Sequence, residues 1–367
     1  MNRRNFLRTS AFAASFALPA WSRANTAVAQ FAPDPGNGWR VFELVSHIEP
    51  LAGAGPTRVW LPLPSISDAA WIRPMGNLWQ GNAESVRIVE SPEYGASMLM
   101  AEWQDAAAPR LEVVSRFATR DRAVDFARPG AARQLAAAER SLYTRATELI
   151  PTDGIVLATA NDIVRGARTD EDKARAIYEW VVDNTFRNPK TRGCGLGDVR
   201  TMLETRDLSG KCADLNALYV GLTRAAGVPA RDVYGVRVAD SRYGYKSLGK
   251  SGDVSKAQHC RAEVWLERFG WVPVDPADVR KVALEEPPGQ LALDDAKVVA
   301  ARRTLFGAWE MNWLGYNFAH DLRLPGSSGP TIPYLMYPQG ERGGARFDSL
   351  DPAAFRYALT ARELPAS

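Results

Sequence analysis

One cysteine, Cys212, lies where a reactive thiol is expected. Apolar residues follow it with the spacing of one helix face, at Leu215, Leu218, Tyr219, Leu222 and Ala226. Gly227 and Pro229 end that segment, so Cys212 is predicted in the first turn of a helix. Unpaired N–H groups and the positive end of the helix dipole stabilise a thiolate there, and Lys211 adds positive charge. Position alone also suits a small buried hydrophobic residue.

His259 is the candidate base for this nucleophile. Polar and apolar residues alternate from position 259 to 267, which predicts a strand with His259 on its polar face and Cys260 on its core face. A turn at 268–270 returns the chain, and Asp275 then falls on the face of His259. A carboxylate on the far ring nitrogen fixes the imidazole tautomer, as nucleophile–base–orienter chemistry requires. A structural histidine and a turn aspartate before Pro276 are the alternative interpretation.

These motifs together resemble a known family. Gly210-Lys211-Cys212 at a helix start, Ala226–Arg231 at its end, His259 and Gly270–Pro276 are similar to the transglutaminase-like core. That superfamily has a papain-related α+β fold with a Cys-His-Asp triad in this chain order. The resemblance covers about residues 155–280 and implies Cys212 as nucleophile, His259 as base and Asp275 as orienting acid. Many members have Ala-Trp after the histidine, whereas this chain has Cys260-Arg261, so the substrate-facing wall is expected to differ.

Two other motifs compete with this interpretation. Gly244–Ser251 fits the P-loop pattern, but it leads into the strand at His259 and not into a phosphate-binding helix. A loop over residues 240–258 that flanks the site is therefore favoured. A zinc site would need Cys194, Cys212, His259 and Cys260, yet His259 and Cys260 should face opposite ways and no C-x-x-C pair is present. No metal or other cofactor is expected.

Three cysteines can form at most one internal disulfide, which would leave one thiol unpaired. A Cys194–Cys260 disulfide would leave Cys212 as the unpaired thiol. Cys260 suits a plain core position equally well.

The elements around the site suggest four regions. Short β-rich runs at 41–45, 58–61, 86–89, 98–100 and 111–117 predict a β-sandwich-like domain. Helices are predicted over 134–150, over 155–165 and after Thr169, where Asp172 completes a capping box. We therefore expect a signal segment at 1–29, a β-rich domain at 30–130, a transglutaminase-like core at 131–285 and a C-terminal extension at 286–367 packing on the core.

The first 29 residues resemble an export signal. Arg3-Arg4-Asn5-Phe6-Leu7 precedes the apolar run 11–21, which is too short to span a bilayer. The paired arginines are similar to a twin-arginine signal, with cleavage expected after Ala24 or Ala29. An ordinary secretory signal is the alternative, and both predict a periplasmic or secreted protein. No other apolar stretch approaches ~18 residues, so no membrane span is expected in the mature form.

Charge excludes some classes of partner. The chain has 45 Lys and Arg against 42 Asp and Glu, a net charge of +3. Residues 1–29 contribute four arginines and no acid, so the remainder carries −1. A near-neutral body argues against nucleic acid or an anionic membrane as the main partner. The sequence therefore predicts an exported cysteine-dependent amide hydrolase or acyltransferase acting on peptide or protein amides, with a non-catalytic binding or assembly module as the alternative.

Overall fold

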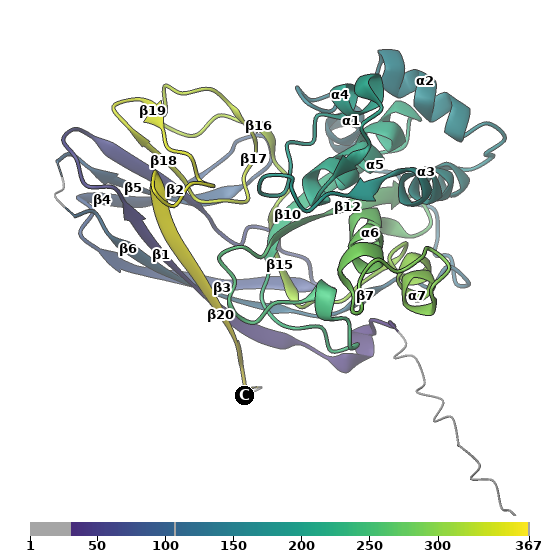
Figure 1. Ribbon diagram of the computed structural model, residues 1–367, viewed down its shortest axis with the longest axis horizontal. Coiled ribbons are helices and arrows are strands. Elements are labelled where there is room, and N and C mark those ends of the chain that lie inside the picture. Colours follow the sequence, from purple (N-terminus) through teal and green to yellow (C-terminus); the bar gives the residue numbers. More distant parts are fainter. Residues whose placement is uncertain (1–30, 106–107, 366–367) are drawn as a thin grey trace, which may run out of the picture.

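The computed structural model describes residues 31–105 and 108–365, and its β-rich half is a sandwich of two five-stranded sheets (Figure 1). Across the first sheet the strands are β11 (Gly252–Asp253), β20 (Phe355–Leu364), β1 (Arg40–Pro50), β6 (Leu111–Thr119) and β3 (Ile72–Gly81). Across the second they are β19 (Ala345–Arg346), β18 (Gln339–Arg342), β2 (Thr57–Pro62), β5 (Ser97–Trp103) and β4 (Ser85–Glu90). Apolar side chains of both sheets, such as Val113 and Leu99, pack between them. The predicted β-sandwich is confirmed.

Strand β3 is the one long strand of the sandwich that the sequence pattern does not predict before β6. It contains Pro74 and Gly76, which both disfavour strands. A bulge between these residues interrupts its pairing with β6, and β3 lies at the edge of its sheet. An edge strand pairs on one side only, so it tolerates a proline that cannot donate to the ladder.

The other half is an α+β unit, as predicted, built on a four-stranded antiparallel sheet. Its strands are, in order, β13 (Gly270–Val274), β12 (Gln258–Leu266), β10 (Ala230–Arg237) and β15 (Trp313–Asn317). Helix α5 (Cys212–Ala225) packs on β12 and β10, and it also contacts α2 (Gly154–Ile163), α3 (Asp170–Asn184) and α6 (Pro276–Glu285). Because α5 lies between the sheet and these helices, residues 212–224 are all buried.

Shorter elements complete the described chain. They are the helices η1 (Pro35–Asn37), α1 (Ala137–Thr144), α4 (Val199–Thr205), η2 (Lys246–Leu248) and α7 (Ala296–Thr304), and the strands β7 (Arg122–Ala123), β8 (Phe186–Arg187), β9 (Ser209–Gly210), β14 (Ala308–Trp309), β16 (His320–Leu322) and β17 (Ile332–Tyr334).

The helix predicted over 134–150 is wrong beyond Thr144, where α1 ends. Arg145 is extended, with φ −72° and ψ 156°. Its side chain pairs with Glu93 of the sandwich, and its carbonyl accepts a hydrogen bond from Arg224 at 3.3 Å. These tertiary contacts override the helix propensity of the segment. The other two helix predictions correspond to α2 and α3, and the predicted capping box at the start of α3 is present.

Residues 286–367 contribute strands to both halves. Strand β15 belongs to the core sheet, whereas β18 and β20 belong to the two sheets of the sandwich. Strand β11, from the segment before His259, also pairs with β20. The two halves are therefore joined by strand pairing (Figure 1). Among the described residues no helix has the length and apolar character needed to cross a membrane, and the predicted signal at 1–29 lies outside them.

Candidate active site

Helix α5 begins at Cys212, as predicted, and a buried carboxylate fixes the turn before it. Asp214 accepts hydrogen bonds at 3.0 Å from three backbone N–H groups, those of Leu196, Gly197 and Lys211. Two glycines make this approach possible, since a Cβ at Gly195 would lie 1.9 Å, and one at Gly210 2.5 Å, from the nearest Asp214 atom. The loop 194–197 is thereby held against the start of α5.

The Cys212 side chain is buried beside two other thiols. The neighbouring thiols of Cys194 and Cys260, followed by His259, hold the pKa of Cys212 well below its ordinary value, although burial opposes this. The contact with Cys212 raises the pKa of Cys194, and burial raises the pKa of Cys260. Of the three thiols, Cys212 is the one whose surroundings favour the thiolate, and it lies at the positive end of α5.

The imidazole of His259 connects this thiol to two carboxylates. Its Nε2 lies 2.8 Å from Oδ2 of Asp275 and 3.4 Å from Oδ1 of Asp278. Burial lowers the pKa of His259, but Asp278 and Asp275 outweigh it and raise the pKa to about 9. The two shifts have opposite directions, a lowered pKa at Cys212 and a raised pKa at His259, and both favour the charged forms of a thiolate–imidazolium pair.

Asp275 caps helix α6 while it holds the histidine. Its Oδ1 accepts hydrogen bonds from the Asp278 N–H at 3.0 Å and from the Asn216 side-chain amide at 3.3 Å, which leaves Oδ2 for His259. The predicted antiparallel return is present, with Ala262 paired to Val274. The structure thus brings together the three residues that the sequence selected.

The polar face predicted for β12 exists, but it is buried. Arg261 is 2% exposed and Glu263 is fully buried. Glu263 is paired with Arg231 at 2.7 Å and with Arg122. Strand alternation separates the two faces of a strand, but it does not tell whether the polar face meets water or buried partners.

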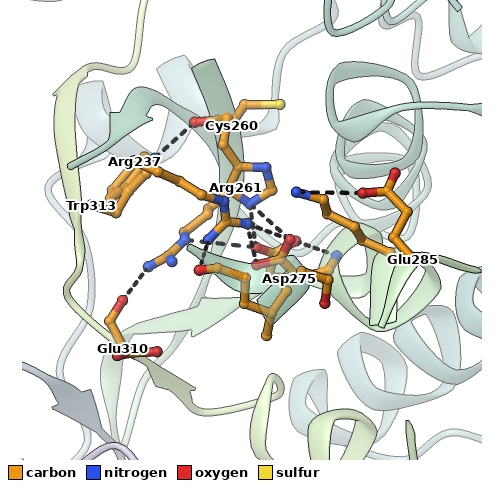
Figure 2. Close-up of polar contacts among 12 residues, drawn as sticks. Arg237, Cys260, Arg261, Asp275, Glu285, Glu310 and Trp313 are labelled. Atoms are coloured by element: carbon orange, nitrogen blue, oxygen red, sulfur yellow. Dashed lines mark hydrogen bonds and ion pairs between the residues drawn. The ribbon is translucent and has the colours of Figure 1, made fainter. Parts of the chain in front are cut away.

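Three charged residues of the site were missed by sequence reasoning: Asp278, Arg237 and Arg261. Arg237 donates to both oxygens of Asp278, at 2.6 and 2.8 Å, and Arg261 Nε lies 3.6 Å from Oδ2 of Asp275 (Figure 2). Burial raises the pKa of Asp278, but Arg237 and His259 hold it well below its ordinary value. The available signal was the spacing of Asp275 and Asp278, three positions apart at a helix start. Nothing local distinguishes the two arginines.

Two sequence comparisons decide the family. Residues 157–276 match the family model of the transglutaminase-like superfamily. An uncharacterized protein of Haemophilus influenzae is 35% identical over 360 residues, which cover 94% of this chain and 96% of that protein. The chain belongs to the transglutaminase-like superfamily.

The fold of this superfamily member also resembles a solved structure. A proposed cysteine protease from Cytophaga hutchinsonii superposes with a TM-score of 0.51 at 13% identity, covering 89% of this chain and 98% of that one. At this identity the likeness concerns the fold. An α+β core with a β-sandwich, the fold class expected from the sequence, is observed, but the sandwich does not simply precede the core, because β11 lies within the core region of the chain and β18, β19 and β20 follow it.

The structure of this transglutaminase-like protein decides the disulfide and P-loop alternatives. All three cysteines are free thiols, and Cys194 donates to the Gln258 carbonyl at 3.3 Å, so no Cys194–Cys260 disulfide is formed. The P-loop pattern is followed directly by β11 and not by a helix. The context that phosphate binding requires is therefore missing at Ser251.

One group in the described part of the chain brings potential metal ligands together: His259, Asp275 and Asp278. Arg237 and Arg261 already place two guanidinium groups beside these carboxylates. A metal ion there would meet two cations, so the residues fit a balanced charge network better than a metal site.

A cleft of about 650 Å³ opens over Cys212 and His259. Part of its lining comes from the C-terminal region, through residues that we call the C-terminal wall: Tyr337, Leu350, Phe355 and Tyr357. The segment 240–258 also lines the cleft, as expected for a loop that flanks the site. Cys212 therefore faces a space that can hold several residues of a peptide.

Proposed function

We propose that this protein is an exported cysteine-dependent amide hydrolase or acyltransferase that acts on peptide or protein amides through a thioester at Cys212. The observation that supports it best is that Cys212 and His259 line one cleft while His259 Nε2 lies 2.8 Å from Oδ2 of Asp275, and the directions of the pKa shifts at Cys212 and His259 agree with it. Superfamily membership and the fold likeness to a proposed cysteine protease support the same general chemistry. Such a pair has no evident use in a purely binding module.

The proposed reaction follows from the charges of the site. The Cys212 sulfur adds to the amide carbonyl carbon, and the protonated His259 gives its proton to the leaving amine as the C–N bond breaks. Water or a second amine then opens the thioester. Asp275 orients the imidazole and stabilises its charge without taking the proton. Backbone N–H groups at the start of α5 meet the negative charge on the carbonyl oxygen.

Gln258 is the candidate side-chain donor to that oxygen. It lines the cleft, is 8% exposed, and its Nε2 has no hydrogen-bond partner among the described residues. A buried amide donor without a partner is unfavourable in the free enzyme. An oxyanion in the cleft would supply the missing acceptor, so the interaction would be strongest in the transition state.

The test is alkylation of Cys212 by iodoacetamide across pH, located by peptide mapping. We expect the reaction to persist well below the free-thiol pKa of ~8.5, because the thiolate is lost only as pH falls through the lowered pKa. A thiol with ordinary pH dependence would contradict the proposal and favour the binding module. Profiling peptide libraries for released ammonia or new N-termini would then separate amidase from peptidase activity, with Cys212→Ala as the control.

Export is supported by the sequence of residues 1–29. The N-terminus of the mature protein is expected near Asn25 or Gln30. Recovery of the chain with Met1 retained would contradict this part of the proposal.

A further inference from the structure

Basic side chains gather around the cleft over Cys212. Five of its lining residues form what we call the cationic rim: Arg187, Lys211, Lys250, Lys256 and Lys281. Two further arginines of the lining are already neutralised. Arg192 is paired with Asp348. Arg237 is paired with Asp278. In the described part of the chain, Asp253 is the one carboxylate that lines the cleft.

The cationic rim is short of negative charge. Glu285 serves two of its members, because it pairs with Arg187 and lies 3.8 Å from Lys281 (Figure 2 labels Glu285). The ion pairs of lysines in the described residues are those of Lys173, Lys281 and Lys297. The other three rim lysines are therefore unpaired there. They come from separate segments, at the start of α5 and on either side of β11.

Lys281 is a member of the cationic rim whose charge is poorly stabilised by water. Its side chain is only 17% exposed, although it carries a charge that water would otherwise stabilise. Burial, followed by repulsion from Arg237, lowers the pKa of Lys281 to about 8. An anion entering the cleft would stabilise this ammonium group more than it would stabilise a solvated lysine.

The accumulation is local and does not reflect a basic protein. The chain beyond residue 29 carries a net charge of −1, since four of the 45 basic residues lie before it. The C-terminal wall, in contrast, offers aromatic and aliphatic surface to the same cleft. A small inorganic anion would use the charge but not this wall, whereas a peptide can use both.

We infer that the cleft binds acidic peptides, so that the substrate carries carboxylate side chains on residues next to the amide that Cys212 attacks. The inference rests on the proposed function and specifies its substrate class. The cationic rim would attract such a peptide and hold it with its carboxylates at the edge of the cleft.

Two tripeptide chloromethyl ketones test this, one with two glutamates and the other with two glutamines in their place. Each alkylates a thiolate by forming a C–S bond and releasing chloride, so no natural substrate is needed. The second-order rate of modification of Cys212 is measured by mass spectrometry. We expect the glutamate probe to react roughly tenfold faster, with a ratio that falls as salt is added.

Variants locate the effect. The double substitution Lys250→Gln and Lys256→Gln should lower the ratio of the two rates roughly three- to tenfold. Lys173→Gln, a lysine on α3 outside the cleft lining, should leave the ratio unchanged. Because the ratio is compared, a uniform loss caused by a folding defect cancels.

The outcomes separate the two proposals. Equal rates for the probes, or a faster glutamine probe, would overturn the inference and leave the nucleophile intact. If neither probe modified Cys212 in the folded protein, the proposed function would fail, and the inference with it. A ratio that Lys173→Gln lowers as much as the double variant does would overturn the assignment to the cationic rim.

Discussion

The surroundings of Cys212 and those of His259 shift the pKa of each residue by different means. Around Cys212 the neighbours are neutral thiols, Cys194 and Cys260, and a helix start. Around His259 the neighbours are buried charges, two carboxylates and two guanidinium groups. A neutral donor shifts a pKa without needing a counter-ion, whereas each buried charge must be balanced by another. We therefore expect substitutions near the cysteine to change reactivity alone, and substitutions near the histidine to change reactivity and stability together.

Removing either member of the pair should have the largest effect. Cys212→Ala and His259→Ala are each expected to abolish nearly all turnover, on the order of 10⁴- to 10⁶-fold in kcat. The double variant should be little worse than either single one, because the pair acts as a unit. The measurement is steady-state kinetics on a peptide found by library profiling. A folded Cys212→Ala protein with undiminished activity would place the chemistry elsewhere.

The two carboxylates offer a matched pair of substitutions. Asp275→Asn should lower kcat by ~10⁴-fold, by analogy with the corresponding change in serine proteases, because the imidazole loses its orienting acceptor. Asp278→Asn keeps that acceptor and should cost less activity. It leaves Arg237 buried without a charged partner, so the free energy of unfolding should fall by about 3–5 kcal/mol in urea titrations.

The pH profile distinguishes these roles further. Because His259 must be protonated to serve the leaving amine, kcat/KM should decline as pH rises through its pKa of about 9. Asp278→Asn removes a carboxylate that raises this pKa, so the basic limb should move to lower pH. An unchanged basic limb in Asp278→Asn would show that the carboxylate does not act on the histidine.

A substitution of Gln258 tests whether its side-chain amide donates to the oxyanion in the transition state. Gln258→Ala should lower kcat by roughly 10²-fold with little change in KM, as for loss of one preorganised donor. An effect confined to KM would assign Gln258 to ground-state binding instead.

The smallest effects are expected from the neutral thiols. Cys260→Ala and Cys194→Ala each remove a neighbouring thiol that lowers the pKa of Cys212, so each should raise the midpoint of iodoacetamide alkylation at Cys212. Activity at neutral pH should change less than about tenfold, since His259 still favours the thiolate. Unfolding curves serve as the control, and a midpoint that does not move would contradict a role for these two thiols.

Short-range pattern was enough to select Cys212, His259 and Asp275, which the structure brings close together. The spacing of apolar residues after Cys212 and the alternation after His259 are local properties, and both elements formed where they were predicted. Asp275 could be placed because a tight turn of known direction joins the two strands. The resemblance to the superfamily supplied the roles, which the geometry supports and experiment must test.

What sequence did not reveal depends on long-range pairing. Arg237 reaches the site because Gly235, two residues earlier, pairs with His259, a register that neither strand encodes alone. The end of α1 depends on contacts between Arg145 and distant segments. The C-terminal wall lies in a Pro- and Gly-rich region whose short strands find partners in both halves.

The C-terminal wall has a consequence for when the cleft over Cys212 can form during synthesis. Strand β20 runs beside β1 along its length, and Arg40 is paired with Glu363, 323 positions away. Synthesis proceeds from the N-terminus, so Cys212, His259 and Asp275 leave the ribosome while Phe355 and Tyr357 are still untranslated. A nascent chain thus carries Cys212, His259 and Asp275 but no complete cleft. Closure of this sheet, whose strands are far apart in the sequence, waits for the last strand. The cleft over Cys212 is therefore complete only after the last strand of the chain has been synthesised and paired.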